Sequence, residues 1–169
     1  MSHPEKLDHP QPRQTSAKGF SLIELLIVVA VILIVAAIAI PNYIQSKMRA
    51  NESAAVHSLR DISTAELFYS STYGINYTTT LSQLSGSGVN PDANNAGLID
   101  EVLASGVRQG YIIVYTPITT DSLGHTITYT VTADPANPGT TGQRHFYTDQ
   151  TCVIRSNIST TAGPTDLPL

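Results

Sequence analysis

A single carboxylate interrupts a long apolar run near the start of this chain of 169 residues. Residues 20–40 read FSLIELLIVVAVILIVAAIAI, and Glu24 is the only charged residue among them. An ionisable side chain inside a membrane-length helix is costly unless it has a partner, so it marks a functional site by default. Leucine or valine would be less costly at this position. Glu24 is therefore a candidate to pair with a cation, for which an amine would be suitable.

The apolar run itself has the length of a membrane span. At 1.5 Å per residue, residues 20–40 would form a helix about 31 Å long, which matches the hydrocarbon core of a bilayer. Because the run is apolar on every side, it belongs in lipid or in the centre of a helical bundle. A secretory signal peptide, which would need a shorter apolar core, and a plain signal anchor are the alternatives. Basic residues flank the run equally on both sides, so the positive-inside rule does not orient it.

The residues around the start of the run form a recognisable motif. Residues 1–19 are polar, contain three prolines, and are predicted to be a disordered leader. Residues 18–26 read KGFSLIELL, which resembles the prepilin processing motif of the type IV pilin-like family. The resemblance implies that a membrane prepilin peptidase cuts between Gly19 and Phe20 on the cytoplasmic side, and that Phe20 becomes the N-methylated first residue.

Cleavage before Phe20 would create the amine that Glu24 lacks. The new amine would lie at the positive end of the helix dipole, at about the depth of the carboxylate. Between two staggered chains, Glu24 of one copy would pair with the Phe20 amine of its neighbour. Such a pair would set the axial register of assembly and would be strong only when shielded from water. The alternative is that Glu24 merely reaches the lipid headgroups.

The helix is predicted to continue to residue 73 in two parts with different tasks. Pro41 should kink or loosen it just before residue 41, and it matches a proline of the pilin family at which the helix extends in the filament. An ordinary kink at the membrane surface is the alternative. Residues 43–73 are amphipathic, with Arg49 and Glu52 expected to pair on the exposed side and Glu66 also exposed. The expected buried stripe consists of Ile44, Met48, Ala55, Leu59, Ile62 and Tyr69.

Residues 74–169 are predicted to form a small α+β head, which together with the helix gives an α+β, pilin-like fold. Gly74 should stop the long helix. An antiparallel β-meander of three or four strands should then pack on residues 41–73. The expected elements are a flexible joint at 85–88, a helix over 96–105, and strands over 110–116, 126–133, 144–148 and 151–155. A tight hairpin at Asp149-Gln150 should join the last two strands.

Cys152 is the only cysteine, so no intramolecular disulfide can form. It is expected to be a small buried residue, with an intermolecular bridge or a reactive thiol as the alternative. Many type IV pilins close a C-terminal loop with a disulfide, and major pseudopilins often carry an acidic calcium site there. The first is impossible here. The second is not visible, since only Asp149 and Asp166 are acidic after residue 134, so the subtype stays open.

No enzyme signature and no cofactor or metal pattern is present in the sequence. A net charge of −4 gives no basic footprint for nucleic acid. The resemblance therefore implies a structural subunit of a type IV pilus, held in the bacterial inner membrane with its N-terminus cytoplasmic and its head periplasmic, and then part of a filament. Its partners would be copies of itself, lipid, the prepilin peptidase and the assembly platform. The alternatives are a pseudopilin of a type II secretion or DNA-uptake system, and a membrane-anchored extracytoplasmic domain that never polymerises.

Overall fold

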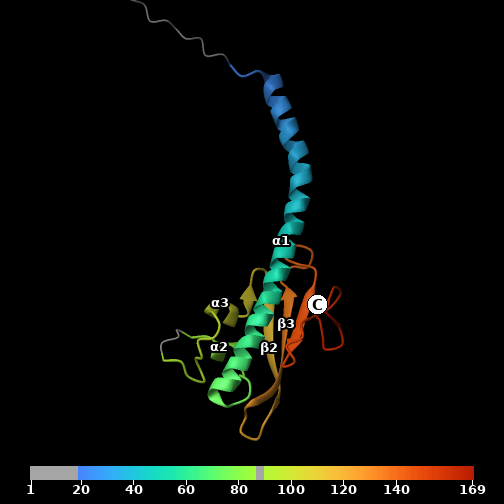
Figure 1. Ribbon diagram of the computed structural model, residues 1–169. Coiled ribbons are helices and arrows are strands. Elements are labelled where there is room, and N and C mark those ends of the chain that lie inside the picture. The colour runs from blue at the N-terminus through green and yellow to red at the C-terminus, as the bar shows by residue number, and fades with distance from the viewer. Residues whose placement is uncertain (1–18, 87–89) are drawn as a thin grey trace, which may run out of the picture. The chain divides into compact units, whose positions relative to one another are not determined.

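The computed structural model describes residues 19–86 and 90–169 (Figure 1). The predicted leader lies almost wholly outside the described residues, as does part of the predicted joint at 85–88. The chain divides into two compact units, of which the first ends at Ile40 and the second begins at Pro41. The long helix α1 spans Leu22–Tyr73 and contributes to both. Pro41 lies inside α1, and the helical assignment continues without a break on both sides of it.

The second part of α1 ends where the sequence predicts. Gly74 adopts a left-handed φ of 66°, and its N–H donates to the carbonyl of Ser70 at 3.1 Å. A residue without a Cβ enters this conformation at little cost, which ends the helix. The predicted stripe is confirmed at Ala55, Leu59, Ile62 and Tyr69, all of which are buried. The prediction is wrong for Ile44, which is exposed.

An antiparallel sheet follows, with its strands in sequence order (Figure 1). The predicted meander is thus confirmed, but it has six strands among the described residues instead of three or four. They are β1 (Val107–Arg108), β2 (Tyr111–Thr120), β3 (Thr126–Pro135), β4 (His145–Asp149), β5 (Arg155–Asn157) and β6 (Leu167–Pro168). Strand β2, second from one edge of the sheet, runs past Pro117, where the pairing with β3 shifts register. A bulge of this kind tolerates a proline, which has no N–H for the ladder.

The core lies between the sheet and the second part of α1. Buried residues of α1 pack with β2 and β3 residues such as Tyr111 and Val131, and with Phe146 of β4. Tyr115 stacks on Tyr129 with ring centroids 5.3 Å apart. Burial of these large rings is the main stabilising contribution available to a head of this size.

Two short helices replace the single helix predicted over 96–105. They are α2 (Leu81–Leu84) and α3 (Glu101–Ala104). Residues 96–99 are not helical, because their N–H groups donate to carbonyls of Gln83, Leu84 and Ser85 instead. The Asp100 side chain caps α3 by accepting the Leu103 N–H at 2.9 Å. The predicted end at Gly106 is confirmed, with φ at 77°.

The antiparallel pairing expected of the last two predicted strands is confirmed for β4 and β5, but the tight turn predicted at Asp149-Gln150 is wrong, because the connection between β4 and β5 runs from Asp149 to Arg155. Asp149 accepts N–H groups from Thr151 on its side chain and from Cys152 on its carbonyl, both at 2.9 Å. These local bonds hold a turn that competes with strand pairing, so β5 begins only at Arg155. Cys152 has a left-handed φ of 59° in this turn. Its thiol side chain is exposed, so the expectation of a buried cysteine is also wrong.

Candidate assembly site

The Gly19–Phe20 bond lies just before α1, at an exposed position. Phe20 has 82% of its surface exposed. A Cβ added at Gly19 would meet no atom of the described residues within 4 Å, and the φ of Gly19 does not lie in the left-handed region. The chain's own packing therefore does not require glycine at position 19. A requirement for glycine at position 19 would have to come from another protein that binds this segment.

Glu24 caps the first turn of its own helix. Its Oε2 accepts the backbone N–H of Ser21 at 2.9 Å, while the Ser21 carbonyl accepts the Leu25 N–H at 3.2 Å. Ser21 is thus the N-cap and Glu24 the third helical residue, as in one half of a capping box. Among the described residues no group donates to Oε1 of Glu24. The carboxylate therefore stabilises the helix start and keeps one oxygen available for a second donor.

The described part of the chain leaves the apolar residues of the first unit uncovered. None of the membrane-length apolar window of α1 is buried, and by length and composition this helix is able to cross a bilayer. Large side chains such as Leu22, Leu33 and Ile38 are each more than 60% exposed. A continuous apolar surface of this size is not stable in water and marks a membrane or protein contact. Phe20, Glu24 and Pro41 are all carried by this segment or its edge.

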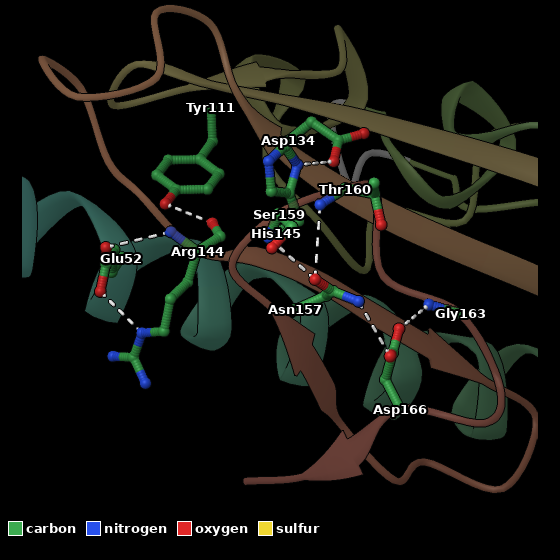
Figure 2. A network of polar contacts seen from close by, with 10 residues as sticks. All are labelled: Glu52, Tyr111, Asp134, Arg144, His145, Asn157, Ser159, Thr160, Gly163 and Asp166. Carbon is green, nitrogen blue, oxygen red and sulfur yellow. Dashed lines mark hydrogen bonds and ion pairs between the residues drawn. The ribbon is translucent and has the colours of Figure 1, made fainter.

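Glu52 joins the second part of α1 to the segment before β4 (Figure 2). Its two oxygens accept the N–H groups of Gln143 and Arg144 at 3.0 and 3.3 Å, and the Arg144 Nε at 2.9 Å. The carboxylate is 7% exposed, so the prediction that Glu52 pairs with Arg49 on the exposed side is wrong. Burial alone raises the pKa of Glu52, but these hydrogen bonds and the guanidinium outweigh it and lower the pKa overall.

Substitution of Glu52 by alanine should destabilise the head by about 3 kcal/mol, because it leaves two backbone donors and one cation without their acceptor. Denaturant unfolding of the detergent-solubilised chain would measure this loss. Since the folded pKa is lowered, the contribution of Glu52 is present above the ordinary carboxyl pKa and is lost as pH falls through the folded value. Arg49→Ala is the matched control, and an equal loss in that variant would contradict the assignment.

The C-terminal segment is held by side-chain to backbone bonds (Figure 2). Asp166 accepts the Asn157 amide at 2.9 Å and the Gly163 N–H at 2.8 Å. The side-chain Oδ1 of Asn157 in turn accepts the Ser159 N–H at 2.9 Å. Asp166 and Asn157 thereby close the last loop without the covalent link that many pilins use there.

Glu66 is a second buried carboxylate, and the prediction that it is exposed is wrong. It is 0% exposed, and its oxygens accept the N–H of Thr78 at 3.0 Å and the Thr78 hydroxyl. Burial raises the pKa of Glu66, and the bonds from Thr78 oppose that shift without cancelling it. Glu66 thus ties the middle of the core helix to the loop that begins the head.

The raised pKa of Glu66 makes the stability of the head fall as pH rises. The folded state binds the proton more tightly than the unfolded state, so this contribution is complete below the ordinary carboxyl pKa and is lost as pH rises through the folded value. Glu66→Gln should remove that dependence, since its amide can donate to the Thr78 hydroxyl and its carbonyl can accept the Thr78 N–H. Unfolding midpoints over a pH series should then fall with rising pH more in the parent than in the variant. Parallel curves would contradict this account.

Comparisons with known proteins agree with the N-terminal segment. Residues 15–40 match the family model described as the prokaryotic N-terminal methylation motif. The type IV wide pilus major component PilA4 of Thermus thermophilus is 52% identical over 46 residues, which cover 27% of this chain and 35% of that protein. The type IV major pilin protein PilA of Myxococcus xanthus is 53% identical over 49 residues, covering 29% of this chain and 22% of that protein. No solved structure matches.

The similarity is thus confined to about a third or less of each relative's length. Both relatives are named as pilus components and not as enzymes, which agrees with the lack of enzyme signatures in this sequence. The methylation motif and the pilin relatives support a type IV pilin-like family, and the long apolar helix followed by an antiparallel sheet has an α+β, pilin-like layout.

Proposed function

We propose that this chain is the precursor of a structural subunit of a type IV pilus. The observation that carries the proposal is the apolar surface of residues 20–40, which the chain leaves uncovered while placing one carboxylate near its start. A helix that is apolar on all sides needs lipid, or the helices of other copies, around it. A filament subunit uses both environments in turn, first in the membrane and then in the filament core.

Processing at the Gly19–Phe20 bond prepares the chain for assembly. A prepilin peptidase removes residues 1–19, and the amine of Phe20 is methylated. Glu24 then accepts the Ser21 N–H through one oxygen and the Phe20 amine of a neighbouring copy through the other. In a dry filament core this ion pair is far stronger than in water, and it selects one axial offset between copies.

Pro41 is the hinge of the long helix in this proposal. A proline has no N–H, so the carbonyl of Ala37 loses its helical partner, and the ring crowds the preceding turn. The boundary between the two compact units falls at this residue. The turn before Pro41 is thus the least costly place for α1 to extend when subunits are drawn from the membrane into a filament.

The proposed location follows from the processing step. The leader faces the cytoplasm, residues 20–40 cross the inner membrane, and the head lies in the periplasm until an assembly platform adds the subunit to a filament. A pseudopilin would share these steps, but the Thermus and Myxococcus relatives are both named as components of pili. A plain membrane anchor could use Glu24 as a helix cap, but it has no use for a charge that pairs with a neighbouring copy.

The direct test is the N-terminus of the protein in its filaments. Surface appendages sheared from the native host should contain this chain beginning at Phe20, with the mass of one added methyl group. The membrane pool should contain the same processed form. Intact chain beginning at Met1, dispersed in the envelope and absent from the sheared fraction, would refute the proposal.

A further inference from the structure

Two of the grooves on the head lie on opposite flanks of α1. One lies between α1 and the segment that contains α3, and the other between α1 and the segment that precedes β4. In Figure 1, α3 and the C-terminal strands lie on opposite sides of the second part of α1. Both grooves belong to the second unit of the chain. Their spacing within the head is therefore determined by its own packing.

The first groove, the Asp61 flank, is acidic and apolar. It has a volume of about 450 Å³ and is lined by Asp61, Phe68, Leu98, Asp100 and Leu103, among others. Asp100 pairs with Arg108 at 2.6 Å, whereas Asp61 makes no ion pair within residues 19–86 and 90–169. Phe68 is 58% exposed although it faces a groove. The flank thus presents one uncompensated negative charge beside an uncovered apolar pocket.

The second groove, the Arg49 flank, is basic. Its volume is about 320 Å³, and its lining includes Arg49, Glu52, Arg144 and Ile158. Arg144 is compensated by Glu52, while Arg49 makes no ion pair among the described residues. Ile158 is 71% exposed at the rim of this groove. The flank therefore presents one uncompensated positive charge beside a protruding apolar side chain, which complements the Asp61 flank in both respects.

The two flanks cannot meet within one molecule. Asp61 follows Arg49 by twelve residues, so the two lie about 18 Å apart along α1 and about 120° apart around it. Between different copies, a contact of one flank with the other uses two different patches. Such a contact is heterologous and repeats without closing unless the rotation happens to close a ring. Repeated contacts of this kind build filaments.

We propose that neighbouring copies pack their heads flank to flank, with Arg49 of one copy against Asp61 of the next. Ile158 of the first copy enters the pocket beside Phe68 and Leu98 of the second. The partner is thus a second copy of this chain, and the inference rests on the proposed filament function. The charges orient the approaching heads, and the apolar contact at the centre supplies most of the affinity.

Charge exchange tests the pairing in the native host. Arg49→Asp and Asp61→Arg each place like charges across the contact and should each lower the yield of sheared filaments at least about tenfold. The double variant restores opposite charges and should recover most of the parent yield. Arg60→Asp is the matched control, because Arg60 is exposed on the same helix and lines neither groove.

Cross-linking provides a readout that does not depend on yield. Arg49→Cys and Asp61→Cys are combined in a Cys152→Ser background, and filaments are treated with a short bis-maleimide. Chains that carry both cysteines should give a ladder beyond the dimer on denaturing gels. Chains that carry either cysteine alone should stay monomeric.

The outcomes separate this interface from the filament function itself. Single variants that assemble like the parent, a double variant no better than the singles, or a missing ladder would overturn the flank-to-flank contact while parent filaments remain. A parent that forms no filaments would overturn the proposed function, and the interface with it.

Discussion

Gly19→Ala should leave the chain unprocessed, with its N-terminus still ahead of Phe20. Because a Cβ at position 19 meets nothing among residues 19–86 and 90–169, the variant should fold and insert like the parent. The effect should fall on the peptidase, where a methyl group next to the scissile carbonyl displaces the bond from its catalytic groups. A displacement of about 1 Å costs about a hundredfold in rate, so processed protein should be scarcely detectable. Mass spectrometry of the membrane pool would measure the ratio of the two forms.

Gly163→Ala is the matched control for this substitution. Gly163 also lacks close neighbours for a Cβ and is not in the left-handed region, so its alanine variant should be processed normally. A normal N-terminus at Phe20 in the Gly19 variant would count against this bond as the cleavage site. If both variants were lost from the membrane, the cause would be degradation. If the Gly19 variant is abundant but unprocessed, degradation is excluded.

The elements with strong local signals were predictable from the sequence. An apolar run as long as residues 20–40 has few alternatives to a helix in lipid, and Gly74 ends α1 through a conformation that glycine adopts readily. The alternation of apolar residues and threonine predicted β3 from its period of two. In each case a short stretch of sequence determines the element without help from distant residues.

Charge is a poor guide to exposure in α1, because two of its glutamates, Glu52 and Glu66, are buried. Glu52 and Glu66 lie seven residues before and after Leu59, a spacing that returns to the same helix face. The position of Leu59 in the predicted stripe therefore already placed both glutamates inside. What the sequence did not reveal are their partners, because Arg144 and Gln143 approach Glu52 only through the tertiary fold.

Two further errors came from local hydrogen bonds that compete with regular pairing. Asp149 binds the N–H groups that follow it, and this turn displaced the predicted strand and exposed Cys152. The cap between Ser21 and Glu24 was also overlooked, although a serine followed three residues later by glutamate is a known helix-start pattern. In the candidate site, the motif predicts the cleavage position, and the spacing of Ser21 and Glu24 is itself the sequence signal for the cap.

Glu24 variants should be inserted and cleaved but should assemble poorly. Glu24→Leu removes both the cap on Ser21 and the charge, while Glu24→Gln keeps an amide oxygen that is able to accept the Ser21 N–H at the third helical position. If pairing with a neighbour's amine is the function of Glu24, both variants should lose filaments. The loss should be at least about a hundredfold, because one partner of a buried charge pair is worth about 3–5 kcal/mol. Sheared filament yield, normalised to processed protein in the membrane, is the measurement.

The glutamine variant separates the two tasks of the Glu24 carboxylate, which are to cap the helix at Ser21 and to pair with the amine of a neighbouring copy. If Glu24 served only to cap the helix, the glutamine variant would assemble normally and the leucine variant poorly. That pattern would show that assembly depends on the cap and not on an ion pair. Glu24→Asp keeps the charge on a shorter side chain and should assemble better than Glu24→Gln, because the Coulomb attraction survives a small increase in distance. If aspartate assembles no better than glutamine, the charge is not what selects the offset between copies.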